Sequence, residues 1–112
     1  MRNLIRTSEF DAFYNALDEK VQEKVDYVLS IMTQMKVVNS KFVKKLENFD
    51  FYEMRVSVGN EYRVILFTID SENFIEATQV LLLNGFKKKS TKDYKPQLAI
   101  AEKIIKQYET ED

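Results

Sequence analysis

Residues 51–89, FYEMRVSVGNEYRVILFTIDSENFIEATQVLLLNGFKKK, form the stretch of sequence that decides the fold. Runs rich in β-branched and aromatic residues, bounded by turn residues, are typical of strands. The sequence therefore predicts an antiparallel meander with strands at 51–57, 61–69 and 74–86. The third run is the longest and most apolar, which favours a central strand. Polar residues at Glu76–Gln79 indicate a bulge or bend there.

The first turn of this meander decides which side chains share a face. A two-residue turn at Gly59-Asn60 would place Arg55 and Arg63 on opposite faces of the sheet. A three-residue loop, Val58-Gly59-Asn60, pairs the two arginines directly and sorts the apolar side chains of both strands onto one face. Because that sorting is much cleaner, we predict the three-residue loop. Both arginines are then expected to project from the sheet face opposite the helices.

The flanking segments supply the remaining elements. Apolar residues at helical spacing predict two N-terminal helices, and a proline suited to a first helical turn predicts a C-terminal one. The expected elements are a short strand within 1–7, helices over 9–17 and 18–35, an extended piece at 42–46, and a helix over 96–109. The predicted fold class is α+β: an antiparallel sheet, made of the short N-terminal strand and the meander, packed on two N-terminal helices, with a C-terminal helix.

The composition bounds both the size and the chemistry of the protein. A chain of 112 residues, 45% of them hydrophobic, with 2 Gly and 1 Pro, predicts one globular domain over 1–112 with a single core. The formal net charge of -1 means that any nucleic-acid site must be a local patch. Absence of both Cys and His excludes thiol and imidazole catalysis, and we expect no metal and no cofactor. Without a signal peptide or a membrane-spanning run, a cytoplasmic protein with no membrane partner is the default expectation.

The charged residues of the meander allow two interpretations. Several cations on one rigid face repel one another unless an anion fills the site or nearby acids neutralise them. Glu53 and Glu61 are such acids, so the arginines form either an anion site or a surface network of Arg–Glu pairs. Residue spacing alone gives these two interpretations equal weight.

RNA cleavage without imidazole or metal would require loss of the 2′-hydroxyl proton, stabilisation of the charge on the phosphorus and a proton for the leaving 5′-oxygen. The planar guanidinium of arginine suits the charge that develops on the phosphorus, and a lysine can take part in proton transfer. Glu53 is a candidate base, and Tyr62 or Tyr94 a candidate acid or stacking surface.

Three motifs resemble a known family: Tyr52-Glu53-Met54-Arg55, Tyr62-Arg63-Val64 and Leu83-Asn84-Gly85-Phe86-Lys87-Lys88. Together they are similar to the HigB-type toxins of the RelE/ParE superfamily, also described as phage-derived, over residues of about 40 to 108. The resemblance implies the toxin of a type II toxin-antitoxin system, a ribosome-dependent mRNA endonuclease (an mRNA interferase). Its implied partners are the ribosome, mRNA and an antitoxin that often carries a helix-turn-helix domain.

Carried over by position, the resemblance implies catalytic roles for Arg55, Arg63 and Lys88. It implies RNA binding by Lys87 and Lys89, and we expect Lys92 and Lys45 to bind RNA as well. Two features depart from the family. Asp93-Tyr94 stand where a Thr-Pro pair is frequent, and the pI near 5.6 is low for such a toxin.

Two other interpretations stay open. One is a binding protein of the same superfamily, either a ParE-like gyrase inhibitor or a detoxified homologue whose face binds without cleaving. The other is an interaction protein whose arginines form structural ion pairs. In each case we expect a monomer when the protein is free.

Overall fold

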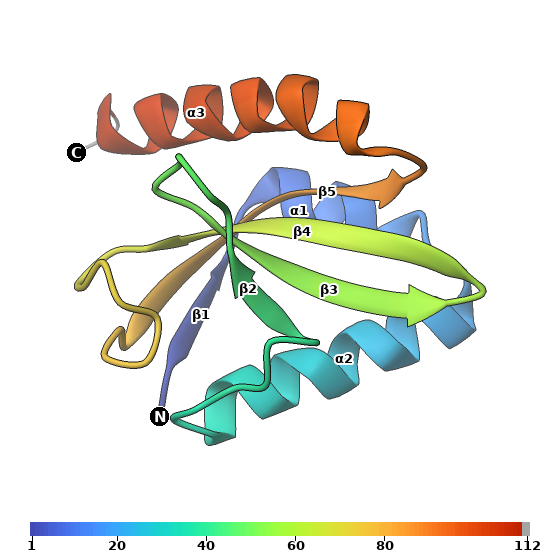
Figure 1. Ribbon diagram of the computed structural model, residues 1–112, viewed down its shortest axis with the longest axis horizontal. Coiled ribbons are helices and arrows are strands. Elements are labelled where there is room, and N and C mark those ends of the chain that lie inside the picture. The colour runs from blue at the N-terminus through green and yellow to red at the C-terminus, as the bar shows by residue number, and fades with distance from the viewer. Residues whose placement is uncertain (111–112) are drawn as a thin grey trace.

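The computed structural model describes residues 1–110 and has a five-stranded sheet with helices on both sides. The strands follow the order β1-β5-β4-β3-β2, in which β1 and β5 are parallel and the other pairs antiparallel. Figure 1 shows this arrangement. In chain order the elements are β1 (Asn3–Arg6), α1 (Ser8–Asn15), α2 (Glu19–Gln34), β2 (Val43–Lys45), β3 (Tyr52–Val58), β4 (Asn60–Thr68), β5 (Gln79–Lys88), a 3-10 turn (Thr91–Asp93) and α3 (Tyr94–Thr110).

The predicted α+β class and the antiparallel meander are confirmed. Two details of the third strand differ from the prediction. β5 begins at Gln79, because Phe74 and Ala77 are buried in a hydrogen-bonded turn that precedes it. The irregularity lies farther along, where Ile65 of β4 faces two residues of β5, Leu83 and Asn84. β5 is an interior strand, although β4 takes the middle position of the five.

The register at the first turn follows the predicted odd-length loop. Val58 pairs with Asn60 around Gly59, and Arg55 pairs with Arg63. Gly59 has a φ of 68°, a left-handed conformation that favours glycine. The turn therefore sets the phase of both strands and brings the two arginines to one face.

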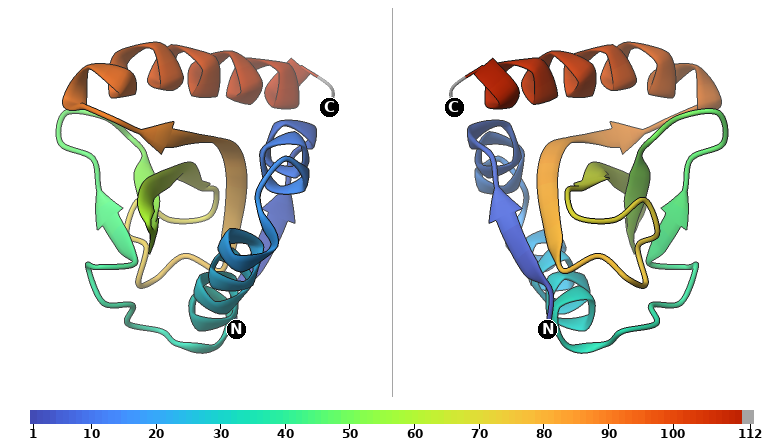
Figure 2. Two further views of the ribbon diagram at one scale, coloured as in Figure 1. Left: turned by 90° about the vertical axis from the view of Figure 1, so that its right-hand side faces the viewer. Right: turned by 90° about the vertical axis from the view of Figure 1, so that its left-hand side faces the viewer.

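The sheet separates two apolar cores, where the sequence had predicted one. We call its two sides the α1–α2 face and the α3 face, after the helices that cover them (Figure 2). Met54, Val56 and Val64 point into the first core beneath α1 and α2. Ile65 and Phe86 point into the second, against Leu98 and other residues of α3. The face opposite the N-terminal helices is thus partly covered by α3.

Gly85 explains how α1 packs so closely on the sheet. A Cβ atom at this position would lie 2.4 Å from a ring carbon of Phe13, well inside contact distance. The glycine of the Gly-Phe-Lys-Lys segment thus has a packing role on the α1–α2 face, and it stands one residue from the bulge in β5.

Candidate cationic site

The α3 face carries the charged residues of β3 and β4, as the register predicts. Arg55 and Arg63 are directly paired, and Ser57 is paired with Glu61. Glu53 is on the same face because side chains alternate along a strand. The prediction that the two arginines share a face is therefore confirmed.

Arg63 is buried, contrary to the expectation that both arginines project freely. Its side chain is 2% exposed and that of Glu53 4% exposed, and Arg63 Nε lies 3.1 Å from Glu53 Oε1. The same Nε donates a hydrogen bond to the Tyr94 hydroxyl, and Nη1 donates to the Tyr62 carbonyl at 2.9 Å and to Glu61 at 3.3 Å. The cause is α3, which begins at Tyr94 and lies across this part of the sheet. Arg63 thus forms the centre of an ionic network. This arrangement is closer to the predicted network of Arg–Glu pairs than to an open anion site.

Glu53 is the common partner of Tyr94, Arg55 and Arg63 in this network. Its Oε1 accepts a hydrogen bond from the Tyr94 hydroxyl at 3.0 Å and lies 3.4 Å from Arg55 Nε as well as 3.1 Å from Arg63 Nε. Burial raises the pKa of Tyr94, the hydrogen bond from Arg63 lowers it, and the negative charge of Glu53 adds to the rise. Oε1 of Glu53 thus accepts one hydrogen bond, from Tyr94, and forms ion pairs with both arginines.

Arg55 is the accessible arginine. Its side chain is 31% exposed, and its only carboxylate partner among the described residues is Glu53. Glu61 lies at the solvent side of Arg63, with a pKa lowered by the Ser57 hydroxyl and by Arg63. The guanidinium of Arg55 can therefore meet an external anion while Glu53 fixes its Nε.

Lys88 completes the site from β5. It is paired with Glu61, which places it on the α3 face, and its Nζ lies 5.6 Å from the centre of the Tyr94 ring. This is a cation–π distance. The turn that follows is held by Asp93, whose carboxylate accepts from the main-chain nitrogens of Ser90 and Lys89; these bonds lower its pKa. Asp93 therefore anchors the segment between Lys88 and α3.

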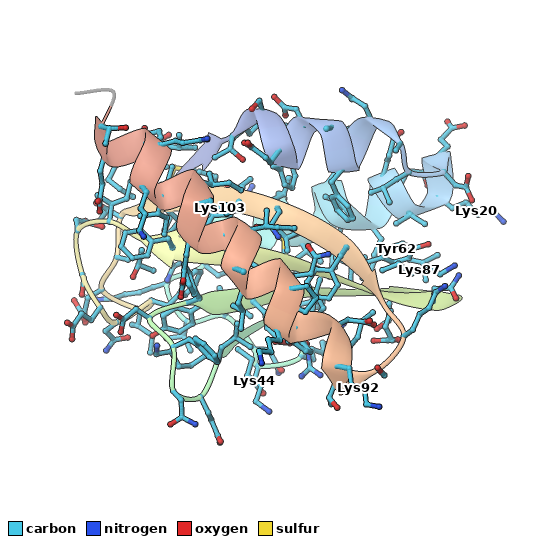
Figure 3. All side chains as sticks on the ribbon, turned by 90° about the horizontal axis from the view of Figure 1, so that it is seen from above. Lys20, Lys44, Tyr62, Lys87, Lys92 and Lys103 are labelled. Atoms are coloured by element: carbon cyan, nitrogen blue, oxygen red, sulfur yellow. The ribbon has the colours of Figure 1, made fainter. Side chains whose placement is uncertain are left out.

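Other predicted residues are placed elsewhere. Lys87 is paired with Tyr62, and both lie on the α1–α2 face. Lys45 is paired with Tyr52 on that same face, with its Nζ 5.4 Å from the Tyr52 ring centre. In Figure 3 the side chains of Tyr62 and Lys87 lie together, away from the labelled Lys44 and Lys92. Tyr62 is thus not an acid or base beside the arginines, and Lys87 and Lys45 do not extend their face.

Lys44 is the cation that sequence reasoning missed. It is exposed and paired with Glu53, so it lies on the α3 face beside Arg55. Alternation within β2 is the available signal, but the sequence predicts only a short extended piece there and does not identify its partner strand. Lys89 and Lys92 are exposed at the end of β5 and in the 3-10 turn. We call Arg55, Lys88 and Lys44, with the buried Arg63 and Glu53 and the partly buried Tyr94 behind them, the cationic site.

The cationic site suits anion binding. Within residues 1–110, no group of three or more acidic side chains is arranged to hold a metal ion. In the same part of the chain, no helix is long and apolar enough to cross a membrane. The accessible ammonium and guanidinium groups of Lys44, Lys88 and Arg55, beside the network of Arg63, Glu53 and Tyr94, can hold a phosphodiester and stabilise added negative charge on it.

Comparisons with known proteins agree with the fold. Residues 12–106 match the family model described as phage derived protein Gp49-like (DUF891). The free toxin RelE of E. coli, solved as a double arginine-to-alanine mutant, superposes with a TM-score of 0.64 at 18% identity, covering 93% of this chain and 97% of that chain. RelE in the intact RelBE toxin-antitoxin complex of E. coli gives a TM-score of 0.61 at 18% identity, with 80% and 100% covered. A search of curated protein sequences finds no match.

Proposed function

Since the chain belongs to the phage-derived Gp49-like family, we propose that it is the toxin of a type II toxin-antitoxin system and cleaves ribosome-bound mRNA. The family and the RelE-like fold support the toxin assignment. The observation that carries the chemical part is that Arg55 is partly exposed and shares the α3 face with Lys88, with only Arg63 and Glu61 of β4 between them, while the buried cation Arg63 is already neutralised. An external phosphate meets Arg55 and Lys88, not Arg63.

The proposed roles follow from exposure and partners. Arg55 binds the scissile phosphate and stabilises the charge that develops as the 2′-oxygen, whose proton passes to water, bonds to the phosphorus and the bond from phosphorus to the 5′-oxygen breaks. Lys88 supplies a second positive charge, and its ammonium can donate a proton to the departing 5′-oxygen. Arg63 is a positioning residue: with Tyr94, it holds Glu53 in the orientation that fixes Arg55. The RNA backbone on either side of the scissile phosphate is bound by Lys44, Lys89 and Lys92.

The proposed partners are mRNA on the ribosome and an antitoxin, with a helix-turn-helix protein as the expected type. The RelBE complex among the similar folds supports a proteinaceous antitoxin. Because the overall charge is -1, affinity for free RNA is expected to be low and steeply salt-dependent. The ribosome then supplies much of the substrate recognition, which places the activity in the cytoplasm.

Induction in growing cells tests the proposal. We expect growth arrest together with new 5′ ends in a reporter mRNA, mapped by primer extension. Arg55→Ala should abolish both, whereas Lys20→Ala, an exposed cation of α2 on the other side of the sheet, should keep them. Both variants should retain the wild-type circular dichroism spectrum. Arrest without new mRNA ends would contradict the endonuclease.

A second candidate function is favoured by the burial of Arg63. If the two arginines do not act together on one phosphate, the cationic site binds its target without cleavage, as expected for a ParE-like gyrase inhibitor or a detoxified homologue. A supercoiling assay with purified DNA gyrase separates these outcomes. Inhibition of supercoiling by wild type and not by Arg55→Ala would support the gyrase inhibitor.

A further inference from the structure

Two neighbouring hollows lie at the end of the molecule where α3 finishes. One, of about 490 Å³, is between the segment before β3 and the C-terminal half of α3. The other, of about 420 Å³, is beside the turn that follows β4. Both include Asp50 and Phe67, so they are continuous. We call this combined feature the acidic groove; its main residues are Phe49, Asp50, Phe67, Glu72, Glu102 and Glu109.

The floor of the acidic groove is apolar. Phe51 and Phe67 pack edge to face with ring centres 6.2 Å apart, and Ile105 of α3 lies beside them. Phe49 stands at the rim, and 43% of its surface is exposed. A hollow of this size, lined by aromatic and aliphatic side chains, can accept a large apolar side chain.

The rim of the acidic groove is negatively charged. Five carboxylates line the groove against two lysines, and one of the lysines, Lys45, already donates to the main-chain carbonyl of Phe49. Asp70 is bound by Thr78 and Gln79, which lowers its pKa to about 2, so its charge persists over the physiological range.

α3 adds negative charge of its own. The carbonyl end of a helix carries partial negative charge and favours cations, yet the last turn of α3 has no basic residue and carries Glu109. Lys106 is the only lysine that α3 contributes to the groove, so a further positively charged group there would be attracted by the remaining carboxylates.

We propose that the acidic groove is a docking site for a cationic amphipathic segment of a second polypeptide. An apolar side chain of that segment fills the hollow above Phe67, and its lysines or arginines meet Asp50, Glu102 and Glu109. The groove lies where α3 ends, whereas Lys88 and Tyr94 of the cationic site lie where β5 ends and α3 begins (Figure 1). Glu53 and Lys44 are the members of the cationic site nearest to the groove. A segment bound there leaves Arg55 and Lys88 uncovered.

Fluorescence anisotropy with the full chain tests this docking site. The probe is a labelled amphipathic peptide of about 18 residues with leucine on one face and lysine on the other; its matched analogue carries glutamate in place of each lysine. We expect the lysine peptide to bind at least about tenfold more tightly than the analogue, and to weaken with added salt.

Matched variants locate the binding. Phe49→Ser combined with Glu102→Gln removes one apolar and one charged contact at exposed positions, and should weaken the lysine peptide by about tenfold. Glu23→Gln on the exposed side of α2 removes one charge outside the groove and should leave affinity unchanged. Amide chemical-shift changes on titration should concentrate at the groove residues.

Three results would overturn the proposal. They are equal binding of the two peptides, unchanged binding by the groove variant, or self-association in sedimentation that the groove variant abolishes, since a second copy of this chain would then be the occupant. These measurements use no RNA and no ribosome. The docking site and the proposed mRNA cleavage can therefore fail independently.

Discussion

Removal of Arg63 should destabilise the protein far more than removal of Arg55, although the two residues are paired in the sheet. Arg63 is 2% exposed and shares Glu53 with Arg55, which is 31% exposed. Deleting one partner of a buried ion pair leaves the other charge buried and typically costs about 3–5 kcal/mol. Arg55 and Tyr94 would still contact Glu53 in Arg63→Ala, so the lower end, about 3 kcal/mol, is expected.

Thermal and urea unfolding measure this difference. An unfolding entropy of about 2.1 cal/mol/K per residue, over 112 residues, converts about 3 kcal/mol into a Tm roughly 13 °C lower. Arg55→Ala removes a partly exposed pair, worth about 0–1 kcal/mol, and should lower Tm by less than roughly 5 °C. The double variant Glu53→Met with Arg63→Met should recover most of the loss, because it removes both buried charges.

Equal destabilisation by the two single variants would refute this reasoning. It would mean that the Arg63 guanidinium reaches solvent in the native state and is not held by Glu53 and Tyr94. The result also matters for function. If Arg63→Ala is destabilised as expected, its loss of activity says little about chemistry, and Arg55→Ala is the informative variant.

Two further predictions concern packing and pH. Gly85→Ala places a Cβ 2.4 Å from the Phe13 ring and should lower the free energy of unfolding, measured in urea, by about 1–3 kcal/mol. Adding Phe13→Leu to Gly85→Ala should restore part of this lost stability. An unchanged free energy of unfolding in Gly85→Ala would mean that α1 shifts freely. Asp70 has a folded-state pKa of about 2 against an ordinary value of 3.8, so the stability it contributes is complete above roughly pH 4 and is lost as pH falls towards 2. In Asp70→Asn, the urea midpoint should fall less than in wild type between pH 5 and about pH 2; parallel pH curves would contradict the assignment.

The sequence alone determined the meander and its register. Alternation of apolar and charged residues in 51–57 and 61–69 allows only one loop length that keeps Met54 and Val64 on the same face, because a shift by one residue turns every side chain to the opposite side. The same alternation brings Arg55 and Arg63 together without any contact from a distant segment. The helical spacing of 9–17 and 18–35 similarly located α1 and α2.

Only the tertiary structure decided which cations are accessible. Strand alternation assigns Arg63 to a face but contains no information about what covers that face, and α3 brings Tyr94 over it from 31 residues away in the chain. Arg2 is a parallel case: nothing near the N-terminus predicts burial, yet its guanidinium donates to the main-chain carbonyls of Met32 and Phe74.

The two lysines of β2 show the same limit. Lys44 and Lys45 are equivalent in the sequence, and only the pairing with β3 places Lys44 beside Glu53 and Lys45 on the other face. The physical reason is common to all these cases. Local patterns fix the phase of an element, whereas the burial and partners of a charge depend on segments that are distant in the chain and pack against it only in the folded state.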